Sequence, residues 1–192
     1  MSSKARAAPV ISLLPLNADD HSQALQEVYH ATPGYWQQYN LPGAPAQRAE
    51  ADLREAAETP GRTLLGIVRH LSGEPSGAPG SASGVELVGM IDFRLHWPDP
   101  QVVYLGMVMV AEPYQRQGIG SAAWGLLAPW LVQGAQMTLA RTGVEQFNPS
   151  AMRFFQSIGF HLTGASSRIQ SGKRWVRLLY MEQPLTPTQP AT

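Results

Sequence analysis

The sequence predicts one domain of the α/β (α+β) class, with a mixed, mainly antiparallel central sheet of about six to seven strands flanked by about four helices. Two observations support this. Short apolar runs rich in β-branched residues alternate with stretches of helical spacing. The 192 residues contain 44% hydrophobic residues, which suits one compact core. We expect the domain to span residues 10–183, between a disordered N-terminus at 1–9 and a disordered Pro- and Thr-rich tail at 184–192.

The first part of the chain reads as a strand, two helices and a second strand. Val10–Leu14 is a β-branched run closed by proline, and acidic residues mark a helix that starts at Ala18. Pro45–Glu58 is rich in helix formers until a Pro-Gly pair stops it, and Arg62–His70 reads as a strand. Ser72–Gly84 consists largely of Gly, Ser, Ala and Pro and predicts a mobile loop.

The middle of the chain predicts a central strand pair followed by a helix. Val85–His96 and Val102–Val110 are extended apolar runs separated by a Trp-Pro-Asp-Pro turn, which favours an antiparallel pair. From Gly118 the apolar residues take helical spacing. Pro129 lies late in this helix and predicts a bend or an early end there.

The last third predicts a short strand, a helix and a final strand pair. Met137–Arg141 can be a strand, and Asn148-Pro149 is typical of a helix start because Asn caps helices and Pro suits the first helical position. The helix ends near Gly159, and Phe160–Ile169 and Arg174–Met181 flank a Ser-Gly turn.

Composition excludes several classes of function. Lys and Arg together number 14, as do Asp and Glu, so no global field favours nucleic acid or an anionic membrane. The absence of cysteine excludes disulfides and a covalent Cys intermediate. His96 and His161 lack metal-ligand spacing, so we expect no metal. The apolar run Val10–Leu16 is too short for a signal or membrane helix, and a cytoplasmic location is the default expectation.

A glycine-containing segment between a predicted strand and helix carries the chemistry. Gly118 and Gly120 lie where the first amides of a helix have no intrahelical partner, so a pyrophosphate can bind there, and Arg116 adds a positive charge. An isolated glycine pair more often serves close packing of helix on strand. No P-loop lysine motif and no full Gly-x-Gly-x-x-Gly are present, which disfavours a nucleoside triphosphate.

A second motif makes the ligand more specific. Gln115-x-x-Gly118-x-Gly120 is followed about thirty residues later by Asn148-Pro149-x-Ala151 and then by Gly159-Phe160. This order resembles the GNAT superfamily of N-acetyltransferases, whose co-substrate is acetyl-CoA.

The resemblance extends over Val85 to Met181 and implies a coenzyme A site. The strand before the loop would be bulged and would splay from its neighbour, leaving a wedge for the pantetheine arm. The pyrophosphate would lie on the loop amides, and Asn148 would contact pantetheine, cap its helix, or do both. The residues expected to bind the cofactor are Val108, Met109, Val110, Gln115, Arg116, Gln117, Gly118, Ile119, Gly120, Ser121, Asn148 and Phe155, with Phe154 as an alternative to Phe155.

The implied reaction is direct attack of an amine on the acyl thioester, with a backbone N–H near Met109 stabilising the oxyanion. The family's usual tyrosine acid is replaced here by Phe155, and its frequent glutamate base by Gly143. The remaining candidates are Asp92, Glu112 and Glu145.

Two of these carboxylates have a simpler interpretation, so Asp92 is the preferred candidate. The negative charge of Glu112 would stabilise a nearby helix N-terminus, and Glu145 would be a solvated loop acid. Asp92 lies between apolar residues on a central strand, so it should either face the cleft or meet a cation.

An aromatic cluster, Tyr35, Trp36 and Tyr39, can frame the acceptor amine or pack in the core. The resemblance implies a small-molecule or peptide amine as the acceptor, and a homodimer is a further expectation from it. Three functions compete: an active N-acyltransferase, a non-catalytic acyl-CoA-binding module, and an interaction protein whose cleft is closed.

Overall fold

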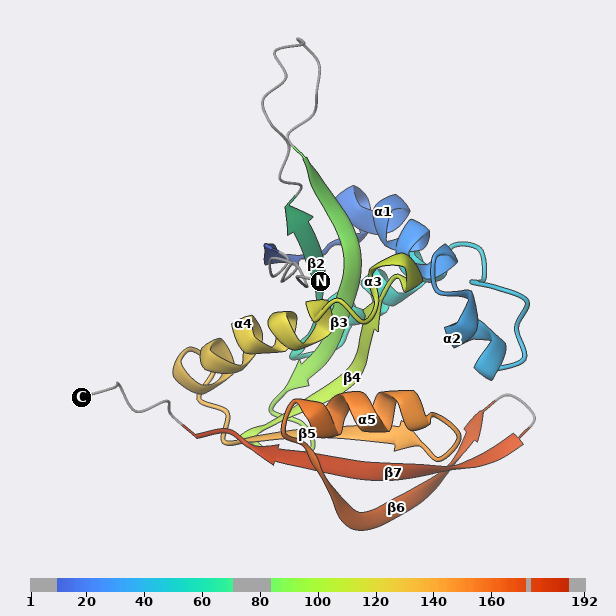
Figure 1. Ribbon diagram of the computed structural model, residues 1–192. Coiled ribbons are helices and arrows are strands. Elements are labelled where there is room, and N and C mark those ends of the chain that lie inside the picture. Colours follow the sequence, from blue (N-terminus) through green and yellow to red (C-terminus); the bar gives the residue numbers. More distant parts are fainter. Residues whose placement is uncertain (1–9, 71–83, 172–173, 187–192) are drawn as a thin grey trace, which may run out of the picture.

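The computed structural model describes residues 10–70, 84–171 and 174–186, and confirms the α/β class with a seven-stranded sheet (Figure 1). The strand order is β1-β2-β3-β4-β5-β7-β6. The strands are β1 (Ile11–Pro15), β2 (Arg62–His70), β3 (Val85–Leu95), β4 (Val102–Val110), β5 (Leu139–Glu145), β6 (His161–Ser171) and β7 (Arg174–Pro184). The helices are α1 (Ala18–His30), α2 (Pro33–Gln38), α3 (Arg48–Glu58), α4 (Ile119–Gln133) and α5 (Pro149–Ser157), with a 3₁₀ turn η1 at Glu112–Tyr114.

The sheet is mainly antiparallel, as predicted. Five of its six strand pairs are antiparallel, and the pair β4–β5 is parallel. The helices α1, α2 and α3 contribute to one hydrophobic cluster, which includes Leu25, Leu53 and Met90. The helices α4 and α5 contribute to a second cluster, which includes Leu127 and Phe155. The sheet therefore separates two apolar layers, one beneath α1, α2 and α3 (the α1–α3 layer) and one beneath α4 and α5.

Several element boundaries differ from the predicted ones. The helix α2 was not predicted, because six residues are too few to display an apolar period. The helix α3 begins at Arg48 rather than Pro45, since Gln47 adopts a left-handed φ of 58°. An early end of α4 at Pro129 is wrong, because the helix continues to Gln133 with Leu131 fully buried.

The C-terminal strand extends further than predicted. β7 ends at Pro184, and Leu185 is buried, with its N–H donating to Thr138 O at 2.8 Å. These two residues belong to the packed structure although they were assigned to the tail. The predicted disordered N-terminus at 1–9, the predicted loop as far as residue 83, and the tail from residue 187 lie outside the described residues.

The parallel strands β4 and β5 diverge halfway along β4. They pair only from Val102 to Leu105 on β4, ending at Thr142 on β5. On the other side of β4, Asp92 pairs with Met107 and the adjacent Phe93 pairs with Leu105, so Gly106 is an extra, bulged residue. Figure 1 shows that β4 runs upward while β5 runs across the lower part of the view beneath α5, so the two strands separate beyond this point.

Candidate active site

A cleft of about 590 Å³ opens where β4 and β5 diverge. It is lined by the second half of β4, by α5, by α2 and by the segment 115–118, which we call the glycine loop. A volume of this size is typical of sites for cofactors and drug-sized ligands. Among the residues predicted to bind the cofactor, Val108, Met109, Val110, Gln115, Arg116, Gly118, Ile119, Gly120, Ser121, Asn148 and Phe155 line the cleft.

The backbone of β4 directs alternate amides into this cleft. Ala111 N donates to Val88 O at 2.8 Å, so the amide of Ala111 points toward β3. The register continues regularly back to Met109 opposite Met90, and successive residues of a strand alternate in direction. The N–H of Met109 therefore points toward β3, while those of Val108 and Val110 point toward the cleft. The Gln115 side chain supports this assignment, because Nε2 donates to Val110 O at 2.8 Å from the cleft side.

This geometry refines the predicted oxyanion donor. The amide of Met109 itself is directed into the sheet, and its side chain lies in the α1–α3 layer, where Thr32 Oγ1 donates to Met109 Sδ at 3.3 Å. The neighbouring amides of Val108 and Val110 have the orientation that a ligand carbonyl or pantetheine amide requires.

The glycine loop ends at the N-terminus of α4. Arg116 and Gly118 have φ angles of 58° and 79°, and Gly118 occupies the N-cap position. This left-handed turn favours glycine and brings the first turn of α4 to the cleft. Gln117 is the one predicted loop residue that does not line the cleft, since its Nε2 donates to Pro113 O at 2.9 Å.

Gly120 has a packing role as well as a place in the cleft. A Cβ at this position would lie 2.9 Å from Cε2 of Phe154 on α5. The residue is therefore small because α4 and α5 approach closely. The packing interpretation of the glycine pair holds for Gly120, whereas Gly118 has open space around its missing Cβ and is selected by its φ.

Asn148 and Phe155 lie at the junction of the cleft with a smaller cavity. Asn148 caps α5 by accepting a hydrogen bond from Ala151 N at 3.0 Å, and it also lines the cleft. Capping and ligand contact are thus compatible. Phe155 is buried against Phe154 and Phe160 and presents a ring without a hydroxyl to the cleft.

The smaller cavity, of about 120 Å³, lies in the wedge between β4 and β5, and we call it the wedge cavity. Tyr35 of α2, Tyr39 at the C-cap of α2 and Glu145 at the end of β5 contribute polar atoms to it. Tyr39 Oη donates to Glu145 Oε1 at 2.6 Å, although the two residues are 106 positions apart. Burial raises the pKa of Tyr35 to about 12, and burial is also the main cause that raises the pKa of Tyr39. Both hydroxyls are therefore protonated at neutral pH.

The third aromatic residue of the predicted acceptor site does not reach either cavity. Trp36 is buried in the α1–α3 layer, where its Nε1 donates to Tyr29 O at 2.8 Å. The core interpretation is right for Trp36, whereas Tyr35 and Tyr39 line cavities.

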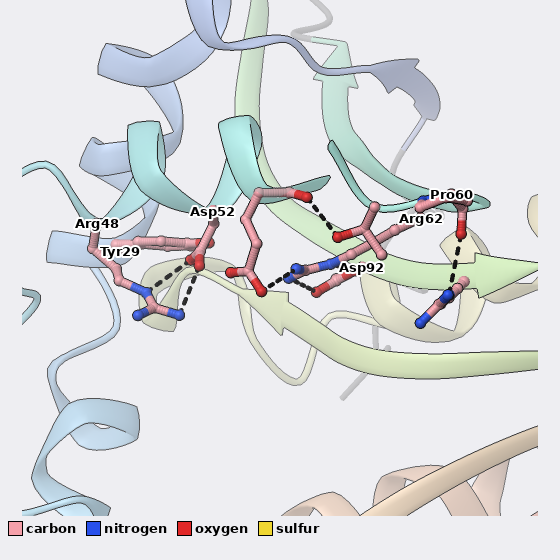
Figure 2. A network of polar contacts seen from close by, with 9 residues as sticks. Tyr29, Arg48, Asp52, Pro60, Arg62 and Asp92 are labelled. Carbon is pink, nitrogen blue, oxygen red and sulfur yellow. Dashed lines mark hydrogen bonds and ion pairs between the residues drawn. The ribbon is translucent and has the colours of Figure 1, made fainter. Parts of the chain in front are cut away.

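The remaining two carboxylates have structural partners. Glu112 lines the cleft, and its Oε1 accepts a hydrogen bond from Gly34 N at 2.7 Å, which holds the start of α2 on the loop. Asp92 meets a cation: Arg62 donates to both of its oxygens at 3.0 and 2.8 Å (Figure 2). Asp92 lines neither described cavity and lies behind Gly106.

A second polar cluster joins α1 to α3 on the same side of the sheet. Asp52 is 5% exposed, accepts a hydrogen bond from Tyr29 Oη at 2.9 Å and forms an ion pair with Arg48 at 2.6 Å (Figure 2). Burial and the adjacent Asp52 carboxylate raise the pKa of Tyr29 well above its usual value. The cluster satisfies a buried acid and fixes the helix that precedes α2.

Six residues of the cleft were missed by the sequence analysis: Thr32, Gly34, Gln38, Tyr114, Ser150 and Arg153. Ser150 and Arg153 could have been found, because Ser150 follows the Asn148-Pro149 motif directly and Arg153 immediately precedes Phe154 on the same helix. The other four reach the cleft through tertiary packing. Among the described residues, no cluster of three or more potential ligands could hold a metal ion. No helix in the described ranges has the length and apolar character needed to cross a membrane.

Comparison with known proteins gives a family and a fold. The model of the acetyltransferase (GNAT) family matches residues 27–160, more than half of the chain. No curated protein matches the chain.

Solved structures share the fold at low identity. An acetyltransferase from Thermus thermophilus is 21% identical, with a TM-score of 0.68 over 93% of this chain and 99% of that one. A probable GNAT-family acetyltransferase from Chromobacterium violaceum is 17% identical, with a TM-score of 0.71 over 95% of this chain and 88% of that one. A spermidine N-acetyltransferase chimera of Vibrio cholerae SpeG and hSSAT is 11% identical, with a TM-score of 0.63 over 91% of this chain and 95% of that one.

Proposed function

Because the chain belongs to the GNAT acetyltransferase family, we propose that it transfers an acetyl group from acetyl-CoA to a primary amine of a small molecule or peptide. The observation that carries this proposal is the divergence of β4 from β5 at a cleft that ends on the first turn of α4. The fold neighbours support the architecture alone, since all three are less than 25% identical.

The cleft offers complementary groups to coenzyme A along its length. The amides of the Arg116 to Ser121 turn and the positive end of α4 suit a pyrophosphate, with Arg116 and Arg153 as flanking cations. The cleft-facing amides of Val108 and Val110 can pair with the amide groups of pantetheine, as a neighbouring strand would.

The wedge cavity then receives the acyl end and the amine. An amide of β4 directed at the developing oxyanion stabilises the transition state, a contact whose loss costs about 3–4 kcal/mol in other enzymes. An alkyl amine with a pKa near 10.4 is neutral about once in 2,500 molecules at pH 7, so a base accelerates the reaction. Glu145 is the carboxylate in the wedge and is held by Tyr39. We assign the proton acceptor to Glu145 rather than to Asp92 or Glu112.

Two carboxylate variants test this assignment against each other. Glu145→Gln should lower kcat by about 10²-fold or more, because general base catalysis typically contributes 10²–10⁴. Asp92→Asn should leave kcat of the folded protein near that of the wild type. It should lower the free energy of unfolding by about 1–3 kcal/mol, since the Arg62–Asp92 pair is 18% and 13% exposed and loses a charged hydrogen-bond partner.

The assay follows release of free CoA from acetyl-CoA in the presence of a panel of primary amines, with urea unfolding of each variant. Full turnover by Glu145→Gln would reject the assigned base. Loss of turnover by a stably folded Asp92→Asn would return the catalytic role to Asp92.

One observation favours a second candidate, a non-catalytic acyl-CoA-binding module. Phe155 occupies the position of the family's usual tyrosine acid and has no proton to donate. Calorimetry with acetyl-CoA separates the possibilities. Micromolar binding with no CoA release across the amine panel would identify a binding module, and absence of binding would reject both functions.

A further inference from the structure

Because Phe155 has no hydroxyl, the departing CoA thiolate has no obvious proton donor. Aminolysis of a thioester forms a C–N bond, breaks the C–S bond and leaves the electron pair on sulfur. The sulfur then needs one proton, and the amine has one proton to lose. The group that donates this proton to the sulfur must lie between the cofactor cleft and the acceptor cavity.

Five described residues line both the cleft and the wedge cavity: Tyr35, Val108, Asn148, Ala151 and Phe155. Of these five, Tyr35 alone has an acidic side-chain proton, because an amide such as that of Asn148 does not ionise in this range. Tyr35 reaches this junction from α2, while Phe155 reaches it from α5. The missing hydroxyl therefore has a substitute on a different element.

Tyr35 is connected to the proposed base. Its ring centroid is 5.1 Å from that of Tyr39. Burial raises the pKa of Tyr35, and the nearby Tyr39 hydroxyl offsets part of this rise. Tyr39 Oη in turn donates to Glu145 Oε1 at 2.6 Å. The order Tyr35, Tyr39, Glu145 runs from the shared junction to the wedge cavity, where the amine is expected.

Tyr35 alone would be a poor acid. Burial raises its pKa to about 12, whereas a thiol has an ordinary pKa near 8.5, so transfer from an isolated Tyr35 to the thiolate is unfavourable. A protonated carboxyl group is a much stronger acid than either group. Transfer is favourable overall when the proton lost by Tyr35 is replaced at once from a protonated Glu145.

We propose that Tyr35 donates a proton to the departing CoA thiolate. Glu145 takes a proton from the attacking amine, and Tyr39 passes a proton from Glu145 to Tyr35. Starting from a neutral amine, the products are an amide and a thiol, and all three side chains end in their initial state. This assignment rests on the proposed function, because it requires CoA in the cleft.

The first test needs CoA alone and no acceptor. A Tyr35 hydroxyl that reaches the sulfur stabilises the thiolate of bound CoA. Near pH 8, Tyr35→Phe should lower the thiolate fraction of bound CoA about tenfold, measured by ultraviolet absorbance. The chain has no cysteine, so the thiolate signal comes from the ligand.

Two controls isolate the hydroxyl. Tyr180→Phe removes a hydroxyl that lies 3.0 Å from Ser167 Oγ and lines neither described cavity, so it should leave the thiolate fraction unchanged. The double variant Tyr35→Phe/Phe155→Tyr restores a hydroxyl at the same junction from α5 and should recover most of the thiolate fraction.

Turnover gives the second readout. Hydroxylamine is a suitable acceptor because it is largely neutral at pH 7, so deprotonation of an ammonium form before the attack does not limit the rate. With acetyl-CoA and hydroxylamine, Tyr35→Phe should lower kcat by about 10²-fold with little change in KM for acetyl-CoA. Tyr39→Phe should lower kcat while keeping the thiolate fraction, because it interrupts only the return of the proton.

The outcomes separate the two proposals. If wild-type protein does not bind CoA in calorimetry, the proposed function fails and this inference fails with it. If CoA binds and the thiolate fraction is the same in wild type and folded Tyr35→Phe, only the proton donor is refuted.

Discussion

Gly120 should be required for the close packing of α4 on α5, and alanine at this position tests it. A Cβ at residue 120 would lie 2.9 and 3.3 Å from Cε2 and Cζ of Phe154. Over-packing of this kind costs about 1–3 kcal/mol, and the loss of glycine flexibility in the unfolded chain offsets about 0.4–1 kcal/mol. We therefore expect Gly120→Ala to lower the free energy of unfolding by about 0.5–2 kcal/mol.

The same substitution should weaken CoA binding. The Phe154 ring lines the cleft, so a ring displaced by the new methyl group occupies space that the proposed ligand needs. A loss of about tenfold in affinity corresponds to 1.4 kcal/mol. An aspartate at residue 120 would be a less informative change, because its steric clash and its charge act together.

A double-mutant cycle identifies the cause. Phe154→Ala removes the ring that obstructs the methyl group, so the cost of Gly120→Ala should fall by at least about 1 kcal/mol in that background. Gly118→Ala is the control, since its Cβ meets nothing within 4 Å and the substitution costs only backbone strain at a φ of 79°. Urea unfolding and calorimetry with CoA give both quantities. A Gly120→Ala variant as stable as the wild type, or costs that simply add to those of Phe154→Ala, would refute the packing argument.

Two further predictions concern helix capping and alkaline pH. Asn148→Ala and Asn17→Ala each remove a cap that accepts a backbone hydrogen bond, at 3.0 and 2.8 Å, so each should cost about 1 kcal/mol in unfolding. Only Asn148→Ala should weaken CoA binding in calorimetry, and equal affinities would leave Asn148 as a cap alone. Burial raises the pKa of Tyr104 from 10.0 to about 12, so the stability that its protonated form contributes is present below pH 10 and is lost as the pH rises toward 12. Tyr104→Phe should flatten the fall in unfolding free energy over that interval, and an unchanged slope would contradict the assignment.

The predicted fold agrees with the structure where the signal is local. The strands β2 and β4 have the predicted bounds, because β-branched apolar runs are interrupted at both ends by Gly, Pro or charged turn residues. The helix α2 and the extension of β7 to Pro184 depend on packing against distant elements, so sequence patterns did not reveal them.

The candidate site divides in the same way. The glycine loop and Asn148 are contiguous motifs, and their place in the cleft could be predicted. The choice among carboxylates could not, because the partners that decide it are distant in sequence: Arg62 is 30 residues from Asp92, and Tyr39 is 106 residues from Glu145. The rotation of α2, which turns Tyr35 outward and Trp36 inward, is likewise set by tertiary contacts.

The short parallel contact between β4 and β5 has a consequence for how the protein opens. Four residue pairs, Val102–Leu105 with Leu139–Thr142, join the two parts of the sheet, whereas β5 and β7 share seven. Native-state hydrogen exchange should therefore find β5, β6 and β7 losing protection as one unit, separately from β1 to β4. A ligand that touches β4 and α5 at once would bridge this seam, so its binding should merge two opening events into one cooperative transition.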